Sequence, residues 1–416
     1  MQKLERFVVF ALLLLATGAG QSFFGDATRS STSDGQPALQ AAFGLLYLAI
    51  FAMLVTRFRT AALDAIKRDK WTLVLCLWAM SSALWSADPG ESFRRSLGLL
   101  GTSMAGLFVG LRYEPRQQLK IISWVIGIGA AASLIVCLVA PGIGITSDGA
   151  WGGIYLIKNT LGRMMALGAL CFALLALGER RHRAVRIAFF LLCCALLVLS
   201  RSATAVVVTV LILAVMPLRR LIYLRTSRLL AAAAVLVPVV AGAVIWVVEY
   251  ADEILLALGR TSSLSGRIPL WQLVWDEITQ RPILGYGFTA FWNSWEGQRV
   301  SDTVAWDVAV PHAHNGFLEI WLGLGIIGLG MLLLSLGRNF ALALRAARGH
   351  SDIEHSWPLL LLVFTLLYNL TENSMLGVNS MPWMAYACVS FWLARTAGEE
   401  AHAPALEPEP EPALSN

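Results

Sequence analysis

The residues of this chain with the clearest chemical potential lie in one short stretch, Pro311-His312-Ala313-His314-Asn315-Gly316. It ends a long polar segment and opens a long apolar one. An imidazole with its ordinary pKa of about 6.5 can take a proton from a hydroxyl group at neutral pH. His314 is therefore the candidate general base, with Asn315 beside it as a secondary candidate. The alternative is a histidine that only satisfies hydrogen bonds at a helix start.

Two histidines one residue apart can also ligate a metal ion. A third ligand with convincing spacing is missing from the sequence around them, and the chain contains no Asp-x-Asp pair. We therefore expect neither a metal nor another cofactor. His312 is a secondary candidate for the site.

Arginines on the same side of the chain's apolar segments form the second group. Arg201 stands in Ser200-Arg201-Ser202, a turn too short to be a solvated loop. An arginine buried there costs several kcal/mol unless it is paired, so we expect an anion ligand; a snorkelling anchor is the alternative. Arg267 opens an amphipathic stretch, where a cation opposes the helix dipole. That mismatch favours a ligand role over a plain surface charge.

Three further residues open an apolar run, with Lys158 and Arg163 on either side of Asn159. Arg163 lies one turn inside the run, so we expect it to face the interior of the protein. Arg95 is a weaker candidate because acidic neighbours could pair with it. Guanidinium groups offer paired donors to phosphate oxygens, and the pyrophosphates expected at a membrane face are polyprenyl pyrophosphates.

The elements that position these residues are membrane helices. Spanning a bilayer takes about 20 mostly apolar residues, and in lipid only helices or closed barrels satisfy the backbone. The apolar runs are long and continuous, which favours helices over strands. The length rule predicts about twelve spans, near residues 7–24, 38–56, 71–86, 96–111, 121–140, 159–178, 187–200, 203–218, 229–249, 315–337, 357–374 and 380–395.

Basic residues occur at every second connection, in the segments 57–70, 112–120, 180–186, 219–228 and 338–348. Lysine and arginine mark cytoplasmic loops, so both termini are expected in the cytoplasm and the candidate site on the outer face. The net charge of +5 is then a topology signal that requires no nucleic-acid partner. The first apolar run is expected to be a retained span, although it could pass for a signal peptide.

One membrane domain is predicted over residues 1–396. Its large outer loop covers 250–313, between the ninth and tenth spans, and contains an expected amphipathic helix from Arg267 to Gln280. That helix either lies at the lipid headgroups or packs against the membrane domain. Residues 397–416 are acidic and proline-rich, which predicts a disordered cytoplasmic tail.

At this point the residues resemble a family. His314-Asn315 followed by Gly325-Ile326-Ile327-Gly328 is similar to the signature of bacterial O-antigen ligases and their polymerase relatives. The other matching segments, in the family's order, are Trp85 to Pro89 with Arg94-Arg95, Lys158-Asn159, Ser200-Arg201, Arg267-x-x-x-Trp271, Gly285-Tyr286-Gly287-Phe288 and Tyr368 to Asn373. Tyr286 is a secondary site candidate on this ground.

The resemblance implies an all-α, polytopic, metal-independent membrane glycosyltransferase of the GT-C type in the inner membrane of a Gram-negative bacterium. Its donor would be an undecaprenyl-pyrophosphate-linked glycan at the periplasmic face. Its acceptor would be a sugar hydroxyl of lipid A-core, in lipopolysaccharide biosynthesis. By motif position the essential residues would be Arg201, Arg267 and His314.

Two other functions stay open. A polymerase would use the same chemistry with a lipid-linked acceptor, making O-antigen or exopolysaccharide. A transporter of lipid-linked glycans would usually show repeated halves and ionisable residues near mid-membrane. Here the unusual charges collect at the outer face, which favours an enzyme.

Overall fold

The computed structural model of the 416-residue chain describes residues 2–19, 36–216, 235, 242, 267–304, 310–349 and 352–402. Its described elements are all helical, apart from an isolated bridge between Ile145 and Trp151. Four helices are long and apolar enough to cross a membrane: α3 (Pro37–Arg57), α7 (Pro115–Val139), α9 (Lys158–Gly178) and α15 (Gly316–Gly349). The prediction of an all-α polytopic membrane protein is confirmed.

Eleven of the predicted spans coincide with helices of the described chain. Besides those four, the helices are α1 (Gln2–Leu14) with its π-helical extension (Leu15–Ala19), α5 (Lys70–Ser81), α6 (Pro89–Arg112), α10 (Arg183–Leu199), α11 (Ala203–Val215), α16 (Trp357–Asn369) and α17 (Met381–His402). The span predicted at 229–249 lies outside the described residues, except for two single positions. Twelve spans and the GT-C fold therefore stay predictions.

Small residues bring α6 and α17 into close contact. A Cβ added at Gly106 would come within 2.5 Å of the Ala387 Cβ, and one added at Gly110 within 2.4 Å of the Cys388 carbonyl oxygen. Such close backbone approach is the usual basis of helix packing in membranes. α17 continues to His402, beyond the predicted start of the tail, and residues 403–416 lie outside the described chain.

The helix α15 contacts α5, α13 (Arg267–Gln280), α16 and α17 and is broken at Gly325. Gly325 has φ 67° and ψ −177°, a conformation open essentially to glycine alone. The break frees carbonyls that an unbroken helix would use internally. Leu322 and Gly323 accept hydrogen bonds from the backbone N–H groups of Tyr286 and Gly287, both at 2.9 Å.

The turn-rich segment 281–287 therefore docks onto the break of α15. Gly285 has φ 70° and Gly287 has φ 99°. A Cβ at Gly285 would come 2.6 Å from the Leu322 carbonyl oxygen. The glycines of the Gly285-Tyr286-Gly287 motif thus allow close approach to α15, which is a structural role.

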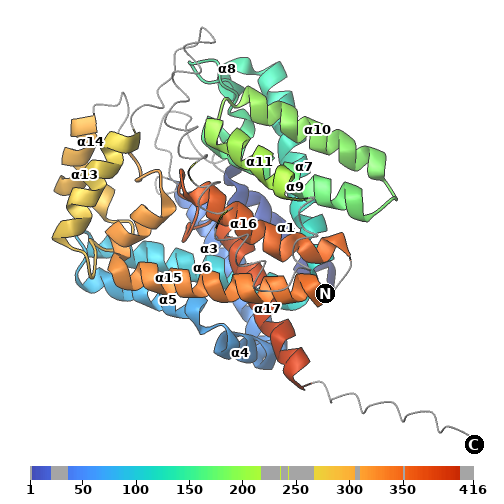
Figure 1. Cartoon of the computed structure of the whole chain (residues 1–416), viewed down its shortest axis with the longest axis horizontal. Helices are drawn as coiled ribbons and strands as arrows, with labels where there is room; N and C mark the ends of the chain where they lie inside the picture. Colours follow the sequence, from blue (N-terminus) through green and yellow to red (C-terminus); the bar gives the residue numbers. More distant parts are fainter. Residues whose placement is uncertain are drawn as a thin grey trace, which may run out of the picture.

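Two helices from the segment predicted as the large outer loop pack together at one end of α15: α13 (Arg267–Gln280) and α14 (Trp295–Val304) (Figure 1). The bounds of α13 are those predicted for the amphipathic helix. Its Trp271 donates to the Ala313 carbonyl at 2.9 Å, and Trp275 packs edge-on against Trp321. These contacts support the packing alternative for α13.

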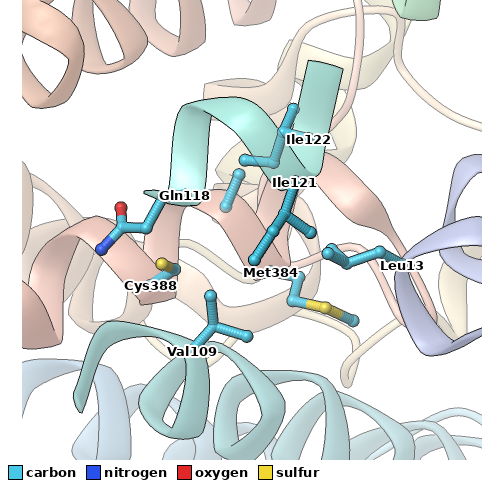
Figure 2. A pocket seen from close by; sticks show the side chains of 8 residues that line it. Leu13, Val109, Gln118, Ile121, Ile122, Met384 and Cys388 are labelled. Atoms are coloured by element: carbon cyan, nitrogen blue, oxygen red, sulfur yellow. The ribbon is translucent and has the colours of Figure 1, made fainter. Parts of the chain in front are cut away.

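Far from these loops, a small pocket lies among α1, α6, α7 and α17 (Figure 2). Its walls are apolar except for Gln118, and its volume is about 10 Å³. A single water needs roughly 10–15 Å³. The pocket is therefore a packing defect and too small for a ligand.

Candidate active site

The candidate site is a buried cluster of His314, Glu372 and Arg267. The Nδ1 atom of His314 lies 3.4 Å from Glu372 Oε2, and Arg267 Nη2 lies 2.7 Å from Glu372 Oε1. The Glu372 side chain is 6% exposed and that of Arg267 is 8% exposed. One carboxylate thus joins the predicted base to a predicted pyrophosphate ligand.

Several helix ends converge on this carboxylate. Asn159, at the start of α9, lies 3.5 Å from Glu372 Oε1 through its Nδ2 atom. Arg267, the first residue of α13, donates to Thr204 in the first turn of α11 at 3.2 Å and also to the Thr371 carbonyl. The starts of α9 and α13 therefore contact Glu372, and the start of α11 contacts Arg267 and Thr371. Helix N-termini favour negative charge, and here they lie close to the Glu372 carboxylate.

Glu372 is ionised in this environment. Burial alone would raise the pKa of its carboxyl, but the positive charge of Arg267 and the hydrogen bond from His314 outweigh burial. The pKa of Glu372 therefore lies well below its ordinary value. Its charge can orient His314 and stabilise the imidazolium that forms when His314 takes a proton.

The backbone of the histidine loop is fixed from both sides at Ala313. Its N–H donates to Glu319 Oε2 at 2.7 Å, and its carbonyl accepts from Trp271 Nε1 at 2.9 Å. The Trp292 indole donates to both Glu319 oxygens. His314 itself has φ 48°, an uncommon conformation for a residue with a side chain. Local strain of this kind is held by the surrounding contacts.

Asn315 caps α15 and does not extend the cluster. Its Oδ1 accepts from the backbone N–H groups of Phe317 and Leu318, and its Nδ2 donates to the Leu370 carbonyl at 3.0 Å. Asparagine is a preferred N-cap because its oxygen satisfies free N–H groups of the first turn. The secondary candidate Asn315 thus positions its neighbour His314.

His312 stacks beside His314, with ring centroids 4.2 Å apart, and its Nδ1 accepts from the His314 backbone N–H. Burial and the positive charge of His314 lower the pKa of His312 to about 3. His312 is therefore neutral at pH 7, which suits a structural hydrogen-bond acceptor.

The structure brings a third possible metal ligand, Glu372, beside the two histidines, although its spacing in the sequence did not indicate one. Ligand atoms of His312, His314 and Glu372 all lie within 4.8 Å of one another. However, Arg267 Nη2 lies 2.7 Å from that same carboxylate. A guanidinium in this position repels a dication and already satisfies one carboxylate oxygen, so the set fits a metal poorly. A metal-independent site stays our prediction.

Two of the predicted anion ligands lie together at Asp148, apart from the cluster. The Lys158 ammonium is 2.6 Å from Asp148 Oδ2, and Arg201 Nη1 donates to the Asp148 carbonyl at 2.7 Å. Arg201 is exposed and has φ 53°. It lies two residues before α11, whose first turn contacts Arg267. Arg201 and Arg267 thus occupy the same end of α11.

Arg163 and Arg95 line a separate cavity next to the cluster. Arg163 faces the interior, as its position one turn inside α9 predicts. Arg95 also binds Glu91 Oε1 at 2.6 Å, the acidic neighbour expected from the sequence. Tyr286 is not brought to the site: its hydroxyl donates to Glu277 at 2.8 Å, and its ring lies under Arg281.

Sequence reasoning missed Glu372, Glu319 and Trp271 as site residues. Glu372 and Trp271 lie in motifs that resembled the family, yet nothing in their spacing assigns them a role. The sequence did contain an indication at Glu372. This acidic residue ends an apolar run, on the side of the membrane where the candidate arginines were predicted to lie. Buried charges are rarely left unpaired, so that carboxylate needed a cationic partner.

Comparison with known proteins gives one family match. Residues 187–333 match the family described as O-Antigen ligase. The match contains Arg201, Arg267 and His314 and ends before Glu372.

Two curated relatives match shorter stretches. The exopolysaccharide production protein ExoQ of Rhizobium meliloti is 32% identical over 97 residues, which is 21% of this chain and 21% of that protein. An inferred polysaccharide ligase of Rickettsia felis is 36% identical over 81 residues, 18% of this chain and 19% of that protein. The matched stretches thus span about a fifth of each relative.

The helical fold with four candidate membrane spans and the family match over residues 187–333 are both consistent with the membrane glycosyltransferase that the sequence resembles. The predicted resemblance is confirmed over residues 187–333, from α10 into α15, which are similar to the O-antigen ligase family.

Proposed function

We propose that this protein transfers a glycan from undecaprenyl pyrophosphate to a sugar hydroxyl of lipid A-core, at the periplasmic face of the inner membrane. The observation that carries the proposal is the buried contact of His314 and Arg267 with the same carboxylate of Glu372. It joins a base to an anion-binding group, the two functions that displacement of a pyrophosphate requires.

In the proposed reaction, His314 removes the proton from the acceptor hydroxyl through Nε2, the nitrogen that does not face Glu372. The hydroxyl oxygen then forms a bond to the anomeric carbon. The bond between that carbon and the pyrophosphate oxygen breaks, and its electron pair leaves with the pyrophosphate. A single displacement inverts the anomeric centre. Glu372 stabilises the protonated His314.

Arginine stabilises the charge that grows on the leaving pyrophosphate. Arg267 binds Glu372, Thr371 and Thr204 in the present conformation. The donor would therefore replace Glu372 as a partner of Arg267. Lys158 and Arg201, which both contact Asp148, would bind other parts of the pyrophosphate or the adjoining sugar. Asn159 and Arg163 would do the same.

The decisive experiment is a transfer assay with the purified chain and an undecaprenyl-pyrophosphate-linked glycan. One reaction contains lipid A-core as acceptor and the other contains a second glycan lipid. We expect product with lipid A-core. Product only with the glycan lipid would replace the ligase with a polymerase, and product with neither would contradict both.

The polymerase is the second candidate because the relative from Rhizobium meliloti is named for exopolysaccharide production. The chemistry at His314 would be the same, and only the acceptor would differ. The matches to both relatives cover about a fifth of their length, and the ligase stays the first candidate because the family match is described as O-Antigen ligase.

A further inference from the structure

The turn that docks onto the break of α15 carries an exposed apolar edge. Ile283 is 60% exposed and Leu284 is 40% exposed. Leu84, which ends the short 3-10 helix (Ser82–Leu84) after α5, is 88% exposed. The next residue, Trp85, donates its indole N–H to the Leu284 carbonyl at 3.0 Å. Two segments far apart in the chain thus form one edge, which we call the turn patch: Leu84, Trp85, Ile283 and Leu284.

The turn patch continues the apolar outer surface of two helices that pack side by side, α5 and α15. Leu77 on α5 and Ile326 on α15 are both exposed. α15 is one of the helices able to cross a membrane, and exposed apolar side chains on such a helix face lipid. The Ile326 N–H donates to the Pro282 carbonyl at 2.9 Å, directly beside Ile283. The patch therefore adjoins a lipid-facing surface, unlike the single apolar side chains scattered on any protein.

The backbone around the patch is satisfied from within the protein. Three indole N–H groups bind three carbonyls at 3.0 Å: that of Trp321 binds Pro282, that of Trp85 binds Leu284 and that of Trp78 binds Leu324. In water such carbonyls would need no protein partner. In lipid each backbone group needs one, and non-helical backbone is tolerated there only when it is satisfied. These three bonds make the turn and the break of α15 compatible with contact to lipid.

The side chains around the turn are those of a boundary between lipid and water. Tryptophan gathers there because its ring is apolar and its N–H is polar. The Trp78 and Trp85 rings lie 5.2 Å apart, and those of Trp275 and Trp321 lie 5.4 Å apart. Arg281, the first residue of the turn, is exposed. An arginine in this place can direct its guanidinium to phospholipid phosphates.

The length of α5 places the patch at the right depth. α5 has 12 residues and the 3-10 helix after it has 3. Together they rise about 24 Å, less than the roughly 30 Å of a hydrocarbon core. α5 starts at Lys70, in a basic segment predicted to be cytoplasmic. A helix this short that starts at the inner boundary ends below the outer one, so Leu84 enters the outer leaflet.

We propose that the turn patch is inserted into the outer leaflet of the membrane, where acyl chains meet phospholipid headgroups. Its partner is phospholipid: the apolar side chains contact acyl chains, and Arg281 contacts phosphate. The segment 281–284, predicted as part of a large loop outside the membrane, is then a membrane anchor that fixes α13 and the break of α15 to the bilayer. This inference does not depend on the proposed function.

The test measures the depth of single labelled cysteines in the full-length protein, in nanodiscs of phosphatidylethanolamine and phosphatidylglycerol. The background lacks the six native cysteines. Ile283→Cys carries an environment-sensitive fluorophore. Leu333→Cys, 49% exposed on α15, is the control within the hydrocarbon, and Asp302→Cys, exposed on α14, is the control in water. The quenchers are iodide in the buffer and phospholipids that carry a nitroxide near the headgroup or at the end of an acyl chain.

The label at position 283 should be quenched most by the nitroxide near the headgroup, at a depth of about 5–10 Å below that boundary, and little by iodide. The label at 333 should respond most to the deeper nitroxide, and the label at 302 to iodide. Iodide quenching at 283 equal to that at 302 would place the turn in water and overturn the proposal. Protection of 283 from every quencher would mean that protein covers the patch, for example a second copy of the chain, and would overturn it too.

The wild-type protein provides a second measurement, which requires no substitution. A phospholipid with a photoreactive diazirine near its headgroup is mixed into the nanodiscs, and labelled peptides are identified by mass spectrometry. Label should appear within residues 282–288 and be absent from 296–303 of α14. A sample in which α15 is labelled and 282–288 is not would contradict the anchor.

Discussion

At the scale of single residues, the site depends on charges held at short distance in a buried place. Glu372 contacts both Arg267 and His314, so no member of the group acts independently. Truncating one partner of a buried ion pair leaves the other charge uncompensated. At Arg267 and Glu372, a conservative substitution therefore tests the role of the side chain better than alanine does.

The replacement His314→Ala should reduce transfer by about a hundred- to ten-thousandfold, the usual contribution of a general base. Donor binding should change little, because the arginines remain. His312→Ala should do less damage, and chelators should have no effect. Turnover of His314→Ala near the wild-type rate at neutral pH would contradict the base assignment, as would a loss of activity that proved to be a loss of folding.

The variants Arg201→Lys and Arg267→Lys separate two roles of arginine. Lysine keeps the charge and loses the planar fork that binds two oxygens at once. Both variants should insert into the membrane, bind the donor more weakly and transfer poorly. Arg267→Lys should be the worse, because Arg267 is buried whereas Arg201 is exposed. Full activity of both would favour an anchoring role.

The pH dependence of stability should report on His312. Its pKa falls from about 6.5 in an unfolded chain to about 3 in the fold, through burial and the charges of His314, Arg163 and Arg267, against which Glu372 acts. Between these two pKa values, His312 binds more protons in the unfolded state than in the folded state. The stability that its neutral form contributes is therefore complete above pH 6.5 and declines as pH falls.

Between pH 5 and 6.5 the contribution of His312 to the unfolding midpoint should therefore fall with acid, so His312→Asn should gain stability relative to the wild type as the pH is lowered across that range. The window avoids most of the titration of Glu372, whose contribution is lost only as pH falls below about 4.3. The exposed His182→Asn is the matched control. An equal slope in wild type and His312→Asn would refute the assignment.

At the scale of elements, sequence patterns located the helices well and their junctions poorly. The amphipathic pattern gave α13 its bounds, because periodicity and apolar length are local properties. Glu372 and Ala313 depend on contacts between segments far apart in the chain, which local patterns do not contain. The break at Gly325 was visible only as a glycine in a motif, since its cause is the docking of the 281–287 turn.

The substitution Gly325→Ala should destabilise the protein and displace that turn. A Cβ there would come 1.9 Å from the Ile283 carbonyl oxygen, and the backbone conformation is strained for any side chain. The cost of the backbone conformation alone is about 1–3 kcal/mol. Thermal unfolding should show a clear drop in midpoint.

Gly330→Ala, on the same helix with nothing within 4 Å of an added Cβ, is the control. It should be neutral or slightly stabilising, because alanine has the higher helix propensity. Equal midpoints for the two variants would mean that the break at Gly325 is not required.

At the scale of the whole molecule, the site residues gather where several helices end. Asn159, Arg201, Arg267 and His314 come from four different segments, and each lies near the end that the charge pattern assigns to the outer side. The alternation of basic loops therefore predicts both the topology and the common face of the site.

Topology can be measured with single cysteines in a background that lacks the native six. A cysteine at Asp302 should react with an impermeant reagent added outside, and one at Arg183 should not. Both positions are exposed in the fold. Reaction at both, or the reverse pattern, would contradict the assignment of the active site to the periplasmic face.

The shared carboxylate of Glu372 has a consequence for the timing of the reaction. While Arg267 holds it, its charge is divided between a guanidinium and an imidazole. In the proposed reaction, a donor dianion that takes the arginine leaves the Glu372 carboxylate to His314 alone. The full charge of that carboxylate then orients the histidine only after the energy-rich lipid has arrived, which favours a compulsory order of substrates, donor before acceptor.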